Sequence, residues 1–248
     1  MGALEKLRRR TTAAGRTWLS STEEDLPGGE TEARLWEILR EDPNDIAAFS
    51  ELAEIVRRQA ARRHHSDQKE QESPQKARER AKTAADDAVW ALSEELAHSG
   101  RAWFPLIELA RLSVHNDREA ALRRLATAAE RDPSGRALAK GLQMLRETGL
   151  PGDALNLGVG HWRPQEHDPQ AGKHLVQAAV EAGRAADARR HLDALSQHPD
   201  QGTVAALRAQ LEQLIARAER HPHKAGQPVL DLRESRSCAA KLRGLLHR

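Results

Sequence analysis

The chain has 248 residues, of which 39% are apolar, 31% are charged and only 3% are aromatic. This balance excludes a disordered chain, and a core built mainly from Ala and Leu, with no Tyr in the sequence, favours helices over sheets. The formal net charge of +2 gives no overall attraction to nucleic acid or membranes, and the single cysteine, Cys238, excludes an intrachain disulfide framework or a Cys-based zinc site.

Residues 1–29 are predicted to be a basic N-terminal segment followed by a linker rich in Ser, Gly and Pro. The basic stretch lacks the apolar core of a signal peptide, and no apolar run in the chain is long enough to span a bilayer. We therefore expect a cytoplasmic protein without a transmembrane segment.

A helical-repeat domain is predicted over residues 30–219, and its first helix is expected over 30–41. Pro43 ends that helix, and Asn44 is the expected N-cap of the next one. A polar insertion at about residues 60–82 follows, with charges of both signs. It is compatible with two helix extensions that project from the domain or with a disordered loop. The partner helix is expected from about Thr83 to Ala97.

A small residue and a turn residue recur together over the next hundred residues. The small residues, at intervals of 33, 33 and 34, are Ala88, Ala121, Ala154 and Ala188, and the turn residues five positions before the last three are Asn116, Gly149 and Gly183. Asn and Gly tolerate the left-handed conformation that ends a helix, and Ala lets two helices approach closely. A period near 33 between helical flanks is typical of an α-solenoid of antiparallel helix pairs.

These units resemble tetratricopeptide repeats over about half of the chain. The residues at the family's apolar, small, turn and Pro positions are Leu106, Leu109, Ala110, Asn116, Ala121, Leu125, Ala128 and Pro133, then Leu138, Leu142, Leu145, Gly149 and Ala154, then Leu175, Ala179, Gly183, Ala188, Leu192, Leu195 and Pro199. In the second unit, Gly158 and His161 stand at the later positions, where the family has an apolar and a small residue. The resemblance implies an all-α, right-handed solenoid, and a related family of helical-pair repeats would carry nearly the same pattern.

The resemblance also implies that the first helix of each pair lines a concave face that binds partners. The residues at its recognition positions are Arg136, Lys140 and Gln143, then Lys173 and Gln177. Arg136 and Lys140 lie four residues apart on one helical face, where they can meet a carboxylate of a bound peptide. The family's clamp for C-terminal carboxylates is not carried over, because the earlier first helices hold residues such as Ser50 and Glu54. A solvated helix face is the alternative reading.

Other candidate chemistry has a structural explanation in each case. Four residues lie close in sequence but match no metal-ligand spacing, and ordinary surface histidines are the reading preferred to a metal site: His161, His167, Asp168 and His174. Trp162 is expected to fill the space left by Gly158 and Gly160 rather than to anchor a ligand. No nucleophile elbow, phosphate-binding loop or His-Glu-x-x-His helix occurs. We therefore predict no enzyme, no metal site and no cofactor.

A capping helix is predicted from Thr203 to about Glu219, and residues 220–248 form a basic tail. The function expected from this organisation is a scaffold that binds a protein or peptide, with an acidic segment favoured by the cations. The alternative is nucleic-acid binding through the basic ends, although the tail has no aromatic residues for base stacking. A third option is that the tail's short amphipathic helix rests on an anionic membrane.

Overall fold

A computed structural model describes residues 29–66 and 73–220 of the chain. These residues form α-helices and no strand, which confirms the prediction of an all-helical fold for this part of the molecule. The predicted N-terminal segment and the basic tail after residue 220 lie outside the described residues.

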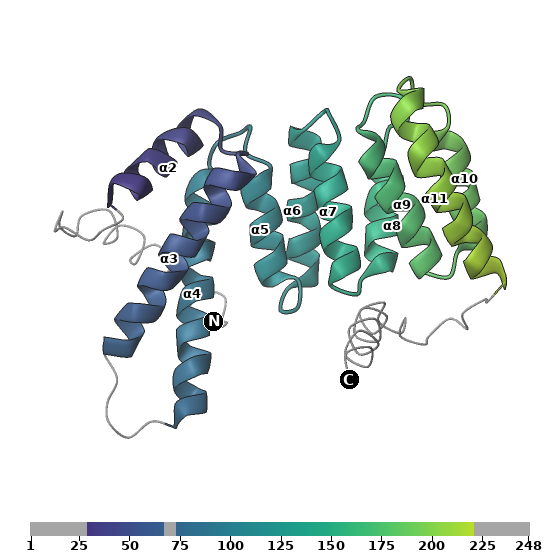
Figure 1. Ribbon diagram of the computed structural model, residues 1–248. Helices are drawn as coiled ribbons and strands as arrows, with labels where there is room; N and C mark the ends of the chain where they lie inside the picture. The colour runs from purple at the N-terminus through teal and green to yellow at the C-terminus, as the bar shows by residue number, and fades with distance from the viewer. Residues whose placement is uncertain (1–28, 67–72, 221–248) are drawn as a thin grey trace, which may run out of the picture.

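The helices from α2 to α8 lie side by side in chain order, and α9, α10 and α11 form the other end of the row, where α11 lies in front of α9 and α10 (Figure 1). They are α2 (Gly29–Glu41), α3 (Ile46–Ser66), α4 (Pro74–Ala97), α5 (Phe104–Ser113), α6 (Arg118–Arg131), α7 (Arg136–Glu147), α8 (Pro151–His161), α9 (Pro169–Glu181), α10 (Ala185–Leu195) and α11 (Gln201–Arg220). Each helix contacts the next, and from α5 onward there are further contacts between second neighbours: α5 with α7, α6 with α8, α7 with α9, and α9 with α11.

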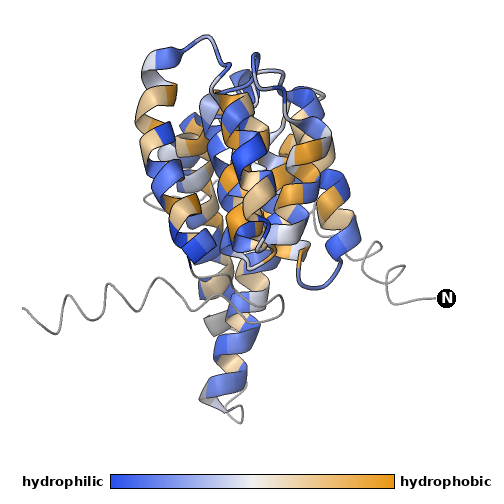
Figure 2. Cartoon of the chain, turned by 90° about the vertical axis from the view of Figure 1, so that its right-hand side faces the viewer, coloured by the Kyte–Doolittle hydropathy of each residue, from blue (hydrophilic) through white to orange (hydrophobic). Residues whose placement is uncertain are grey.

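The polar insertion is helical on both sides of residues 67–72. Helix α3 continues to Ser66 and α4 begins at Pro74, so of the two readings of the insertion the structure shows the helix extensions, and α4 starts more than two turns before the expected Thr83. Pro74 is suited to this place because proline at the first helical position removes a backbone N–H that has no partner there. The two extensions project from the body of the row and are mainly hydrophilic (Figure 2).

Asn44 caps a helix distant in sequence rather than the one that follows it. The N-cap contact of α3 comes from Asp45, whose Oδ1 accepts a hydrogen bond from the Ala48 N–H at 2.9 Å. Asn44 Oδ1 instead accepts from the N–H groups of Trp103, at 2.7 Å, and Phe104, at 3.0 Å. The expectation that Asn44 caps the next helix is therefore wrong. Its partners are at the start of α5, which has no side-chain cap of its own.

Two of the predicted turn residues end helices in the same way. Gly149 and Gly183 have φ angles of 78° and 74°, in the left-handed region that favours glycine. The residue after each glycine donates a backbone hydrogen bond to the carbonyl five residues earlier. The Leu150 N–H donates to the Leu145 carbonyl at 2.8 Å, and the Arg184 N–H donates to the Ala179 carbonyl at 2.8 Å. This is the Schellman closure of a helix C-terminus, and it confirms the two glycines as helix ends.

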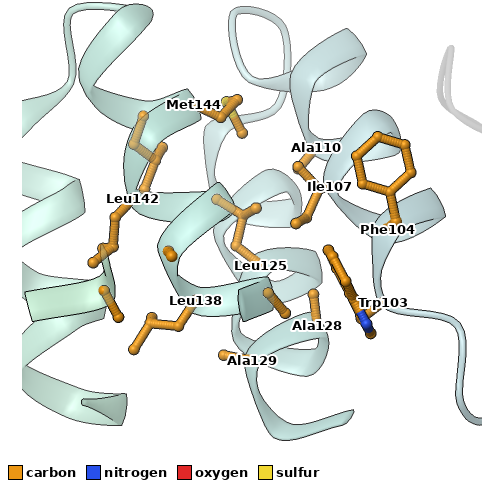
Figure 3. Close-up of a cluster of buried hydrophobic side chains, with 14 of the residues drawn as sticks. Trp103, Phe104, Ile107, Ala110, Leu125, Ala128, Ala129, Leu138, Leu142 and Met144 are labelled. Carbon is orange, nitrogen blue, oxygen red and sulfur yellow. The ribbon is translucent and has the colours of Figure 1, made fainter. Parts of the chain in front are cut away.

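The recurrent alanines are buried, with one exception. Ala121, Ala154 and Ala188 have no exposed surface, whereas Ala88 is half-buried and the adjacent Val89 is fully buried. The apolar positions of the three predicted units pack around these alanines in one continuous core. Figure 3 shows its central part, where Leu125 of α6 lies among residues of α5 and α7.

Ala121→Leu and Ala154→Leu are each expected to lower the free energy of unfolding by about 1–3 kcal/mol, because extra methyl groups must enter a filled core. Urea denaturation of each variant measures the loss. Ala206→Leu is the matched control, since Ala206 lies exposed on α11. If the two buried variants unfold at the same urea concentration as the parent, the alanines do not mark close helix contacts.

Candidate partner-binding site

The five predicted site residues lie on two helices that contact each other. Helix α7 carries Arg136, Lys140 and Gln143, and α9 carries Lys173 and Gln177. The structure thus places all five on a pair of second neighbours in the row.

Arg146 connects α7 to α9, and sequence reasoning missed it. Its Nε and Nη2 donate to the two carboxylate oxygens of Glu181 at 2.9 and 2.5 Å. Its Nη1 donates to Gln177 Oε1 at 2.7 Å and lies 2.8 Å from His174 Nδ1. Only 16% of the Arg146 side chain is exposed, so this guanidinium is part of the packing between the two helices.

The sequence separation of this ion pair recurs in a second ion pair, so it could have been found from the sequence. Arg146 and Glu181 are 35 residues apart, and so are Arg118 and Asp153, which connect α6 to α8 with Nε to Oδ2 at 2.6 Å. Opposite charges 35 residues apart therefore mark contacts between second-neighbour helices in both cases.

His174 lies beside the predicted cations and is held neutral. Burial and then the positive charges of Arg146, Lys173 and Lys140 lower the pKa of His174 to about 4. A neutral ring can accept the Arg146 hydrogen bond at Nδ1, whereas a protonated ring cannot. Lys140 of α7 and Lys173 of α9 thus both lower the pKa of the His174 imidazole.

The lowered pKa predicts a loss of stability in mild acid. Unfolded His174 takes up its proton near its ordinary pKa of 6.5, whereas the folded protein resists protonation down to about 4. The unfolded state therefore binds more protons in between, and stability falls as the pH drops from 6.5 toward 4. We expect this residue to account for roughly 1–3 kcal/mol of that fall.

Urea denaturation between pH 4.5 and 7 measures the effect on the parent and on His174→Gln, which keeps an acceptor for Arg146. The variant should lose less stability in acid than the parent does. His115→Gln is the control, because His115 is exposed after α5. Parallel pH profiles for the parent and His174→Gln would contradict the assignment.

Lys173 and Gln177 also line a groove between α9 and α11. The groove encloses ≈ 220 Å³, and its other lining residues are Gln210, Leu211, Gln213, Leu214 and Arg217. Lys173 Nζ donates to Gln170 Oε1 at 3.1 Å, and within residues 29–66 and 73–220 no carboxylate forms an ion pair with Lys173 or Arg217. The groove therefore presents cations, amides and an apolar floor. Sequence reasoning missed the α11 residues because that helix was considered only as a cap.

The other predicted residues lie outside this groove. Arg136 Nε donates to Ser134 Oγ at 3.2 Å at the start of α7, and Gln143 Nε2 donates to Glu147 Oε1 at 2.8 Å along the same helix. Lys140 is exposed, and it lowers the pKa of His174, which does not line the groove.

The histidine-rich stretch after α8 has structural roles. Asp168 caps α9 by accepting from the Gln170 N–H at 2.8 Å. The expectation of a surface residue is wrong for His167, which is buried against Gly135 because the loops before α7 and α9 pack together. In the part of the chain that the structure describes, no group of three or more His, Cys, Asp and Glu side chains could hold a metal ion.

Trp162 packs over a glycine other than the two expected. A Cβ on Gly172 would lie 2.7 Å from Trp162 Cζ2, so Gly172 makes the room for the indole. A Cβ on Gly158 would instead lie 2.5 Å from Leu175 Cδ1, and one on Gly160 would meet no atom within 4 Å. Packing was the right expectation for Trp162, but the residues named for it were wrong, because the contact crosses from α8 to α9.

Comparisons with known proteins give no further guide. No family model matches the sequence, and neither a curated protein nor a solved structure matches it. None of the described helices has the length and apolar character needed to cross a membrane.

Proposed function

We propose that the chain is a right-handed α-solenoid of antiparallel helix pairs, similar to tetratricopeptide repeats, that acts as a cytoplasmic scaffold and catalyses no reaction. Three observations support a repeat: the contacts between second neighbours, the matching helix ends at Gly149 and Gly183, and ion pairs that span 35 residues. Such arrays bind partners along an extended surface.

The site proposed for the partner is the groove between α9 and α11, and its ligand is an acidic segment of another protein. The observation that carries this proposal is that Lys173 and Arg217 line the groove with no carboxylate partner in the described part of the chain. A carboxylate between them would form charge-assisted hydrogen bonds. The amides of Gln210 and Gln213 can donate to and accept from an extended peptide backbone, and Leu214 offers an apolar contact.

Nucleic-acid binding through the basic tail is the second candidate. Residues 217–248 contain eight Lys or Arg against Glu219, Asp231 and Glu234, and such a tail can neutralise phosphates. Most of this segment lies outside the described residues.

Capture experiments with the intact chain, analysed for both protein and nucleic acid, separate the two candidates. The double variant Lys173→Glu/Arg217→Glu should reduce protein capture by roughly tenfold or more, since charge reversal repels an acidic segment. Arg208→Glu is the control, because Arg208 lies on α11 but pairs with Glu212 outside the groove. A second reversal, at Arg136 and Lys140, tests the predicted α7 positions.

Deletion of residues 221–248 tests the tail. Salt weakens both modes of binding because exposed charges are screened, so salt dependence does not separate them. If the deletion abolishes capture while the groove variant binds like the parent, the groove is not the binding element.

A further inference from the structure

A second cleft lies between α8 and α10 and encloses ≈ 240 Å³. Its lining residues are Leu155, Val159, Arg184, Asp187, Arg190 and His191. It shares no residue with the groove between α9 and α11, so binding at the two sites can be tested separately.

The charged side of this cleft has a net positive charge, and ion pairs hold its side chains in position. Asp187 is 8% exposed, and its two carboxylate oxygens accept from Arg184 Nε and Arg190 Nη2. One carboxylate therefore balances only one of two guanidiniums. Each guanidinium uses one nitrogen on Asp187, and no other described residue accepts from the remaining nitrogens. Those N–H groups are available to a further anion.

The remaining sides of the cleft are apolar or neutral. Leu155, which is 2% exposed, and Val159, which is 63% exposed, both line the cleft together with the arginines. His191 packs edge-on against Trp162, with ring centroids 6.1 Å apart, and burial lowers the pKa of His191, which keeps the ring uncharged at neutral pH. An aliphatic group placed here would cover Val159 and remove apolar surface from water.

We propose that the cleft between α8 and α10 binds a compact aliphatic carboxylate, with the carboxylate on Arg184 and Arg190 and the aliphatic group against Leu155 and Val159. Arginine donors match the geometry of a carboxylate, and two guanidiniums positioned by Asp187 lose little freedom on binding. The cleft is smaller than the roughly 300–1,000 Å³ typical of sites for drug-sized ligands, so it holds one residue-sized group. A small branched-chain acid and a chain-terminal leucine share this chemistry.

Titration calorimetry of the full chain with 4-methylpentanoate tests the proposal, with the corresponding amide as the neutral probe. The acid should bind at least about tenfold more tightly than the amide, since only the acid carries the charge that the arginines recognise. Acetate should bind more weakly than 4-methylpentanoate, because it lacks the branched aliphatic group.

Arg190→Gln and Val159→Glu should each weaken binding of the acid by about tenfold or more, through loss of a donor and through repulsion. Both side chains are largely exposed, so the variants should fold, which circular dichroism can verify. Arg189→Gln is the matched control, because Arg189 is the adjacent residue but pairs with Glu219 of α11. That variant should bind like the parent.

A peptide ending in Leu with a free carboxylate, compared with its C-terminal amide, identifies the source of the ligand. Tighter binding of the free peptide than of 4-methylpentanoate supports a protein C-terminus, and equal or weaker binding supports a small acid. The proposal is overturned if neither the acid nor the free peptide binds, if the amides bind as well as the acids, or if Arg190→Gln and Val159→Glu both bind like the parent.

Discussion

Replacing Gly135 by Ala is expected to lower the free energy of unfolding by roughly 2–5 kcal/mol, because it combines backbone strain with a steric clash. Gly135 has a φ angle of 79°, which side-chain-bearing residues rarely adopt. A Cβ there would lie 2.5 Å from the Cβ of His167. The clash is hard to relieve, since the Asp168 N–H donates to the Ser134 carbonyl at 2.7 Å and keeps the two loops together.

Gly149→Ala is the matched control for this prediction. Gly149 has a nearly identical φ angle of 78°, but a Cβ there would meet no atom within 4 Å. Gly149→Ala should lower the free energy of unfolding by about 1 kcal/mol, from backbone strain alone. Urea denaturation compares the two variants, and equal losses would show that the contact between Gly135 and His167 does not constrain the fold.

Arg146→Met is expected to lower the free energy of unfolding by about 2–4 kcal/mol, because it leaves the Glu181 carboxylate without its partner and removes two further hydrogen bonds. Methionine keeps most of the apolar stem of the side chain, so the loss reports mainly on the guanidinium. The exposed pair of Arg123 and Glu119 on α6 is the control, with 64% and 86% of the two side chains exposed. Arg123→Met should cost no more than about 1 kcal/mol.

A double-mutant cycle isolates the ion pair itself. If Arg146 is stabilising chiefly through Glu181, then Arg146→Met/Glu181→Met should be less damaging than the two single variants added together. Strict additivity would show that the two side chains act independently, and the role assigned to this contact between α7 and α9 would be wrong.

Most of the helices, and the helix ends at Gly149 and Gly183, were predictable because their causes are local. Apolar residues at helical spacing are buried whichever neighbour covers them, and Gly149 and Gly183 close hydrogen bonds that reach back only five residues. The buried positions of Ala121, Ala154 and Ala188 were also predictable, since the sequence places each of them five residues after a turn residue. Beside the polar insertion the pattern of buried alanines failed at Ala88, which is half-buried, whereas the adjacent Val89 is fully buried.

The contacts between helices were decided by tertiary packing. The sequence alone suggested that Asn44 caps the next helix, but the approach of α5, 59 residues later in the chain, makes the Trp103 N–H its partner. The candidate site shows the same division. Lys173 and Gln177 could be placed on a helix from sequence, but which neighbour faces them depends on the angle at which helices cross. That geometry brings α11, with Arg217 and two glutamines, to one side of them and Arg146 to the other.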